Sequence, residues 1–203
     1  AIRLHAKALQ LQTIWLETGA KRWRGRAVQV DPERVDLHFG QPLPAGAAVL
    51  QIGFAGAIAD RDVYGLFRQQ EAGQWAAFSQ FQATGARQAF PLFDEPGWKI
   101  PWTLSLTVPQ ALVAVSNMPV VAEEAARPGF KRVSFQPTPP MPSYLLALGV
   151  GRFETVDAGR GGRDGATPLR IIVPAGRQAD AAYAASVVGP VLGRLEDWFG
   201  MPH

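Results

Sequence analysis

The stretch that decides the fold is residues 79–109, which read SQFQATGARQAFPLFDEPGWKIPWTLSLTVP. A polar strand-like run comes first, then an Ala-Arg turn, the sequence Phe-Pro-x-Phe-Asp-Glu-Pro, and a long alternating segment. In residues 102–108 apolar side chains alternate with Thr and Ser. A period of two with polar β-branched partners is typical of a half-buried antiparallel strand, so this stretch predicts a β fold.

Similar short strand-like runs, separated by Gly, Pro or Asp, extend in both directions from this stretch. They cover residues 9–17, 26–30, 34–39, 48–54, 74–82, 102–108, 113–116, 132–136, 144–149, 152–157 and 169–173. The proline-rich piece at residues 137–142 cannot donate ladder hydrogen bonds, so we expect an extended crossing segment there. The pattern predicts a mainly β protein built as a saddle-shaped antiparallel β-sandwich.

The composition changes at residues 158–167, which read AGRGGRDGAT. We expect a flexible glycine-rich loop there, and with it a boundary between domains at residues 1–165 and 166–203. A strand and then a helix from about Asp180 follow, with apolar residues spaced three and four apart. Asp180 suits the N-cap, Gly189-Pro190 should kink or split the helix, and Gly200 with Pro202 should end it.

Composition limits the class of protein. The chain has 203 residues, 47% of them hydrophobic, with six Trp and no Cys. This is ample for a packed core, and it excludes disulfides, thiolate metal sites and a catalytic cysteine. No apolar run approaches the roughly 20 residues of a membrane-spanning helix. The absence of cysteine leaves the compartment open, with the bacterial cytoplasm and periplasm as the alternatives.

The densest basic cluster is Lys21, Arg22, Arg24 and Arg26, with Trp23 among them. Basic residues interleaved with an aromatic ring can contact phosphate and stack on a base. The alternative is the solvated tip of a hairpin between residues 9–17 and 26–30, with Thr18-Gly19 and Gly25 as turn residues. We favour the hairpin tip and no nucleic acid partner, because one short cluster makes no extended groove.

The residues that usually carry hydrolytic chemistry are sparse. His5, His38 and His203 lie far apart, and no His-Glu-x-x-His is present. A zincin site needs two His one helical turn apart with a Glu between them, so we expect no catalytic residue and no metal site in this chain. Asp94-Glu95-Pro96 could supply an acid–base pair, but a turn held by a nearby Arg87 or Lys99 is the interpretation we favour.

Gln80 and Gln82 are the candidate binding residues. At positions i and i+2 of an expected strand, both side chains leave the same face. Two neighbouring amides can accept from an ammonium group and donate to a carbonyl. The residues by themselves favour the plainer interpretation, a solvent-facing polar strand.

The motifs together resemble the N-terminal domain of the aminopeptidase N and leukotriene-hydrolase family of zinc metallopeptidases. Ile2-Arg3-Leu4-His5-Ala6 is similar to an early strand of that domain, and residues 141–154, MPSYLLALGVGRFE, to the family's M-x-x-Y-L-x-A-x-x-V-G-x-F-E. Residues 169–171 and 198–202 resemble the start of the catalytic domain. The resemblance therefore covers nearly the whole chain.

The resemblance implies roles that the residues alone do not show. Ser79-Gln80-Phe81-Gln82 matches the family's Ser-Gln-x-Gln variant; there the first Gln lines the substrate pocket and the last residue helps to bind the free amino terminus of a peptide. Gln82 departs from the commoner Glu, and a neutral acceptor holds an ammonium group less strongly than a carboxylate does. The implied parent is a zinc-dependent aminopeptidase acting on peptides, to which this chain contributes an inactive fragment.

The resemblance also implies what lies outside these residues. The family domain begins some tens of residues before Ile2, and the Gly-Ala-Met-Glu-Asn and His-Glu-x-x-His motifs follow after the equivalent of His203. We therefore expect an open sheet edge and an apolar helix stripe of Val187, Val191, Leu195 and Trp198, with self-association of the isolated chain as a consequence. A non-catalytic β-sandwich binding or scaffold module is the alternative function.

Overall fold

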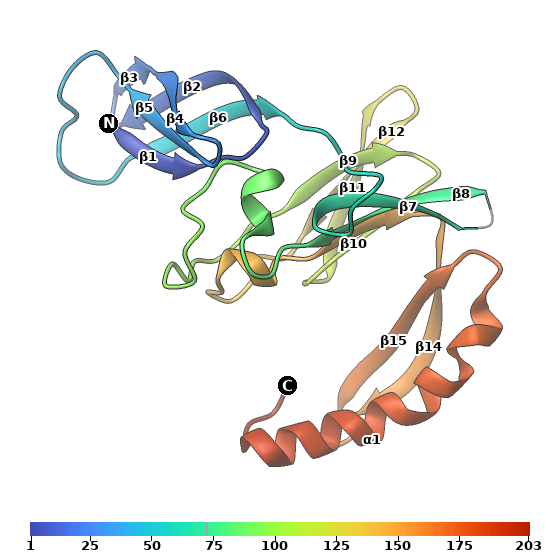
Figure 1. Ribbon diagram of the computed structural model, residues 1–203. Helices are drawn as coiled ribbons and strands as arrows, with labels where there is room; N and C mark the ends of the chain where they lie inside the picture. Colours follow the sequence, from blue (N-terminus) through green and yellow to red (C-terminus); the bar gives the residue numbers. More distant parts are fainter. Residues whose placement is uncertain (72) are drawn as a thin grey trace. The chain divides into compact units, whose positions relative to one another are not determined.

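The computed structural model describes residues 1–71 and 73–203 (Figure 1). It is mainly β, its sheets are antiparallel, and one long helix lies near the C-terminus, which confirms the expected fold class. The residues divide into two compact units. The first comprises Ala1–Val108 and Ala114–Gly149, and the second comprises Pro109–Val113 and Val150–His203.

Two three-stranded sheets share the first core of unit 1. One has the order β1 (Ile2–His5), β5 (Arg34–His38), β4 (Arg26–Asp31), and the other β3 (Lys21–Arg24), β2 (Gln10–Thr18), β6 (Val49–Ala55). Buried side chains alternate along β2 and β5, and with others from β1 and the adjoining loops they form one cluster: Leu4, Ala6, Ile14, Leu16, Val35, Leu37 and Phe39. Since every second residue of a strand points to the same face, this alternation buries one face of each sheet.

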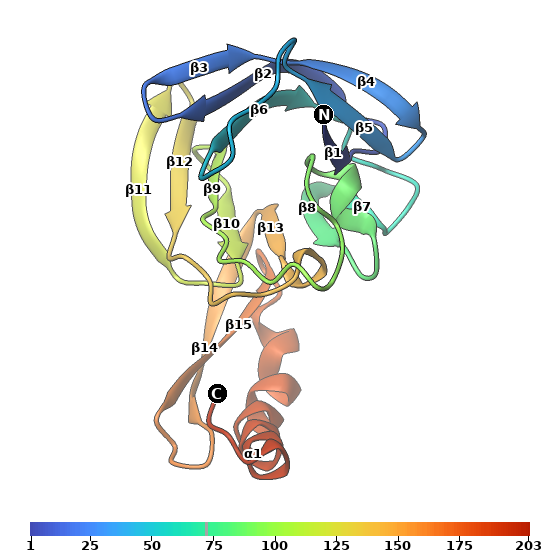
Figure 2. The same ribbon diagram turned by 90° about the vertical axis from the view of Figure 1, so that its left-hand side faces the viewer.

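Two more sheets lie mostly in unit 1 (Figure 2). Their orders are β10 (Val113–Ser116), β13 (Leu148–Gly151), β8 (Gln74–Gln80), β7 (Gly65–Glu71), and β11 (Val120–Arg127), β12 (Phe130–Phe135), β9 (Ser105–Pro109). Two expectations were wrong in detail. The strand expected at 102–108 begins only at Ser105, and the run expected at 144–149 is a 3-10 turn, Ser143–Leu145, before β13.

The strands β7 and β11 were not predicted. In β11 the sequence VVAEEAAR is exposed at nearly every position, so it carries no alternation to detect. It pairs with β12 through an irregular register that shifts twice. Cross-strand pairing, which is not a local property, creates this strand.

Unit 2 contains a hairpin, β14 (Phe153–Gly161) and β15 (Thr167–Pro174), then a 3-10 turn, Gln178–Ala181, and α1 (Ala182–Phe199). The flexible loop expected at 158–167 is therefore wrong for its first half, because β14 continues to Gly161 and pairs with Thr167. A Cβ atom on Gly161 would lie 2.6 Å from the Cα of Gly189 in α1. The glycine thus allows close packing of strand against helix.

The limits of α1 agree only partly with expectation. The helix begins at Ala182, since Asp180 lies in the preceding 3-10 turn and pairs with Arg177. Pro190 lies inside the continuous helix, which it does not split. Gly200 ends it in the left-handed conformation, with φ of 69°, as expected. Within residues 1–71 and 73–203, no helix has the length and apolar character needed to cross a membrane.

The basic cluster of the sequence lies on β3 and the start of β4. The strand β3 pairs with β2, so the hairpin closes at Gly19 instead of joining β2 to residues 26–30. Arg22 lies 3.0 Å from Glu17 and stacks over Trp15 at 4.3 Å from the ring centroid. One member of the cluster, Arg22, is therefore engaged within its own sheet.

Gly25 was expected to serve a turn, but it links β3 to β4 at a point of close packing. Its N–H donates to the carbonyl oxygen of Ile14 at 2.9 Å. A Cβ atom there would lie 2.6 Å from Ile14 Cγ2 and 2.7 Å from Phe39 Cε1. Both neighbours belong to the first core, so they have little room to move.

We predict that Gly25→Ala lowers the free energy of unfolding by about 1–3 kcal/mol, because the methyl group overpacks this core. The matched control is Gly97→Ala, since a Cβ at Gly97 meets nothing within 4 Å. Urea titration followed by Trp fluorescence measures both variants. Equal midpoints for the two would contradict the close packing at Gly25.

Candidate functional site

Gln80 and Gln82 do not share a strand face. The strand β8 ends at Gln80, and Gln82 lies in the turn that follows. Both residues are exposed, whereas Phe81 between them is 1% exposed. The strand prediction was wrong here because the Phe81 side chain is buried in a core while the chain turns away from the sheet. The two amides are still near neighbours at one exposed turn.

The backbone that carries the two amides rests on an aromatic core. Phe81 packs with Ala86, Leu92 and Leu146. Its ring meets Phe90 edge to face with centroids 5.7 Å apart, and Phe90 lies 5.6 Å from Trp102. Edge-to-face aromatic pairs add to the stabilisation that burial provides. The exposed amides are therefore attached to a rigid base.

Hydrogen bonds fix the turn on both sides of Phe81. Ser79 Oγ accepts from the backbone N–H of Leu148 in β13 at 2.9 Å. Gly85 N–H donates to the carbonyl oxygen of Phe81 at 2.8 Å and begins the 3-10 turn Gly85–Gln88. Tyr64 Oη accepts from the N–H of Thr84 at 2.9 Å. Sequence reasoning missed Tyr64 and Thr84, because nothing local connects residues twenty positions apart.

The 3-10 turn Gly85–Gln88 carries Arg87, which is the centre of a network of charged groups. Its Nε donates to Asp94 Oδ2 at 2.8 Å and its Nη1 to Glu33 Oε2 at 2.7 Å. Lys7 Nζ donates to the other oxygen of Glu33 at 2.9 Å. The side chains of Arg87 and Asp94 are only 10% and 1% exposed. Burial in this way is tolerable because each charge is paired and hydrogen-bonded.

The Asp94-Glu95-Pro96 segment is a structural corner and not an acid–base pair. Asp94 Oδ1 accepts from Ser143 Oγ at 2.5 Å, and the Asp94 N–H donates to Nδ1 of His5 at 3.3 Å. The side chain of Glu95 is 54% exposed, whereas that of Asp94 is buried. The favoured interpretation is confirmed, with Arg87 as the partner of Asp94.

No zinc-binding arrangement is present in the part of the chain that the structure describes. Among residues 1–71 and 73–203, no group of three His, Cys, Asp or Glu side chains is placed to hold a metal ion. His5 is occupied as a hydrogen-bond acceptor in the corner. The residues described here therefore do not fit a catalytic zinc, and no step through a metal is assigned to them.

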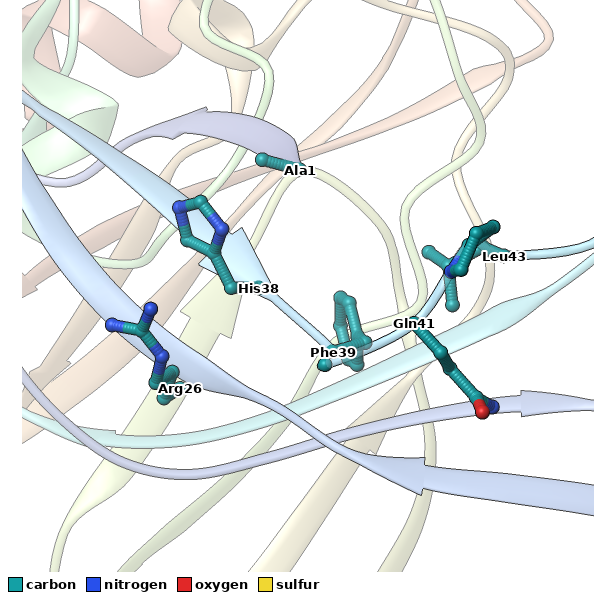
Figure 3. Close-up of a pocket in the computed structure, with 8 residues that line it drawn as sticks. Ala1, Arg26, His38, Phe39, Gln41 and Leu43 are labelled. Atoms are coloured by element: carbon teal, nitrogen blue, oxygen red, sulfur yellow. The ribbon is translucent and has the colours of Figure 1, made fainter.

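Two hollows in unit 1 lie elsewhere. Figure 3 shows one, in which Arg26 and His38, which pair across β4 and β5, lie beside Ala1, Phe39, Gln41 and Leu43. The other is an apolar groove whose lining includes Ile52, Phe54, Phe93, Trp98 and Trp102. Neither of these two hollows is lined by Gln80 or Gln82.

Comparison with known proteins agrees with this fold and with these motifs. The model of the Peptidase M1 N-terminal domain matches residues 1–145, which is most of the chain and nearly all of unit 1. The chain therefore belongs to the peptidase M1 N-terminal domain family, as its motifs indicate.

Its relatives include aminopeptidases from plants, bacteria and mammals. Aminopeptidase M1-B of Oryza sativa subsp. japonica is 34% identical over 85% of this chain and 20% of the relative. Aminopeptidase N of Acetobacter pasteurianus is 33% identical over 100% of this chain and 56% of the relative. Glutamyl aminopeptidase of Sus scrofa is 37% identical over 63% of this chain and 13% of the relative. The chain thus spans only part of the length of each.

We predict that Arg87→Met costs about 3–5 kcal/mol of unfolding free energy, because it leaves the Asp94 carboxylate buried without its cation. Arg34→Met is the control, since the Arg34 side chain in its pair with Asp31 is 48% exposed and solvent-exposed ion pairs contribute little to stability. Urea titration measures both. A loss for Arg87→Met no larger than for Arg34→Met would contradict the importance of the buried pair.

Acid should weaken the same network through Glu33. Hydrogen bonds from Lys7 and then Arg87 lower the pKa of the Glu33 carboxyl group. A carboxyl group with a depressed folded-state pKa stabilises fully above its unfolded pKa, about 4.3. That contribution is lost as pH falls through the lower folded-state pKa.

We therefore expect the stability difference between the natural chain and Glu33→Gln to be constant near neutral pH and to shrink below about pH 5. Urea titrations at a series of pH values measure it. A difference that does not change with pH would show that Glu33 contributes no proton-linked stability.

Proposed function

We propose that the chain is the N-terminal, substrate-pocket-contributing part of a zinc-dependent aminopeptidase that removes N-terminal residues from peptides. Family membership carries the proposal, and the relatives named above are aminopeptidases. In this proposal residues 1–165 are the N-terminal β domain and residues 166–203 begin the catalytic domain. The zinc is held by residues outside this chain and, when bound, supplies an activated water.

The contribution of this chain is recognition of the peptide. Gln80 and Gln82 offer amide oxygens that can accept from the α-ammonium group and NH2 groups that can donate to a carbonyl oxygen. Both are exposed, and the turn that carries them is fixed by the buried Phe81. A pair of amides carried on a fixed backbone can orient the amino terminus, which lowers the barrier by positioning the scissile bond.

The exposed side of α1 supports a second part of the proposal. Val191, Leu195 and Trp198 are 51%, 48% and 84% exposed, although all three are large and apolar. Exposed apolar surface of this kind is typical of an interaction site. We assign it to packing against the remainder of the catalytic domain, and we expect the isolated chain to self-associate through it.

The first test is the coding sequence beyond the codon of His203. The proposal expects Gly-Ala-Met-Glu-Asn and His-Glu-x-x-His there, and zinc-dependent release of aniline from aminoacyl-anilides by the full-length protein. The isolated chain should release none. Absence of these two motifs from the coding sequence would favour the alternative, a non-catalytic binding or scaffold module.

The second test concerns Gln82 in the full-length protein. We expect Gln82→Ala to lower kcat/KM for peptides about tenfold, because the ammonium group loses a hydrogen-bonded partner. Gln82→Glu should raise it, since a carboxylate binds an ammonium group more strongly. Gln74→Ala, at the exposed first residue of β8, is the control. Unchanged kcat/KM in Gln82→Ala would return Gln82 to a solvated surface role.

A further inference from the structure

We infer that Tyr64 is a positioning residue for Gln82, an inference that rests on the proposed function. The hydroxyl oxygen of Tyr64 accepts from the N–H of Thr84 at 2.9 Å. It also shares a hydrogen bond with Thr84 Oγ1 at 3.0 Å. One phenol group thus binds both the backbone and the side chain of the residue two positions after Gln82.

The position of Tyr64 in the fold explains how it reaches this turn. It directly precedes β7, whose first residue, Gly65, is paired with Gln80 at the end of β8. Tyr64 therefore lies beside the point where the ladder stops and the chain leaves the sheet. Its side chain is half-buried and reaches the turn. There the hydrogen bond between its hydroxyl group and Thr84 follows directly after the backbone pairing of β7 and β8, which ends at Gly65 and Gln80.

The five residues from Gln80 to Thr84 are consequently fixed at three points. The β7–β8 pairing holds Gln80, burial of the ring and the hydrogen bond from Gly85 N–H hold Phe81, and the Tyr64 hydroxyl holds Thr84. Gln82 lies between the second and third points. The first two depend on backbone pairing and a buried ring, and only the third depends on one polar side-chain atom.

Tyr64 is therefore the point at which the direction of Gln82 can be changed without removing the fold. Loss of the hydroxyl frees the Thr84 N–H and lets the segment that carries Gln82 shift, while Phe81 stays in its core and keeps its hydrogen bond with Gly85. A displacement of about 1 Å in a positioning group can cost far more in rate than in stability. Tyr64 should accordingly influence recognition of the peptide amino terminus more than the stability of the unit.

The substitution Tyr64→Phe removes only the hydroxyl group. In the 203-residue chain we expect the hydrogen-exchange rate of the Thr84 amide, measured by NMR, to rise about three- to tenfold. This factor corresponds to the net free energy that one hydrogen bond contributes. Thr84→Val keeps the backbone N–H and should slow exchange relative to Tyr64→Phe. Tyr183→Phe, at a residue 77% exposed on α1, is the matched control. An unchanged Thr84 exchange rate in Tyr64→Phe overturns the inference.

The functional readout uses the full-length protein and two inhibitors, leucine hydroxamate and its des-amino analogue. We expect Tyr64→Phe to weaken inhibition by leucine hydroxamate about three- to tenfold and to leave the des-amino compound unchanged, because only the former presents an ammonium group to Gln82. A purely structural defect would weaken both equally, and equal weakening overturns the inference.

Gln82→Ala separates this inference from the proposed function. If Gln82→Ala loses the preference for the amino compound and Tyr64→Phe keeps it, the positioning role fails and the proposed function stands. If Gln82→Ala keeps the preference, the proposed role of Gln82 fails, and the role of Tyr64 in recognition fails with it.

Discussion

The buried contact between Arg87 and Asp94 is the constraint on which the first unit depends. Arg87 comes from the 3-10 turn after β8, and Asp94 from the corner seven residues later, so their contact closes this stretch on itself. The second arm of the guanidinium group reaches Glu33, between β4 and β5. Because a buried charge without its partner is costly, all three segments must adopt their positions together.

The longer stretch from Gln80 to Asp94 also carries the candidate recognition groups. Gln80 and Gln82 lie at its exposed start, Phe81 is in its aromatic core, and Arg87 is at its charged base. These buried groups fix the positions of the two exposed amide side chains along the backbone, because the backbone that carries them cannot move without disturbing the buried groups. This arrangement connects a structural corner to the surface at which we propose that the amino terminus of a peptide binds.

Close approach of backbones limits what the sequence pattern can predict. The glycine-rich residues 158–167 suggested a flexible loop, but Gly161 belongs to β14 and lets it pack against Gly189 of α1. Gly25 suggested a turn, but it makes room for Ile14 and Phe39. Glycine has the same local signature in both situations, since a turn and a tight contact each require the absence of a Cβ atom. The neighbour that needs the space is distant in sequence.

The sequence by itself determined the antiparallel β class, several strands with regular alternation such as β2 and β5, the end of α1 at Gly200, and the family. Local periodicity, capping residues and sequence motifs predict these features. Only the tertiary structure decided that β11 is a strand, that Gln82 leaves β8, and that Tyr64 ties down the turn beyond it. Each of these depends on a partner many residues away, and the free energy of such a contact leaves no periodic trace in either segment.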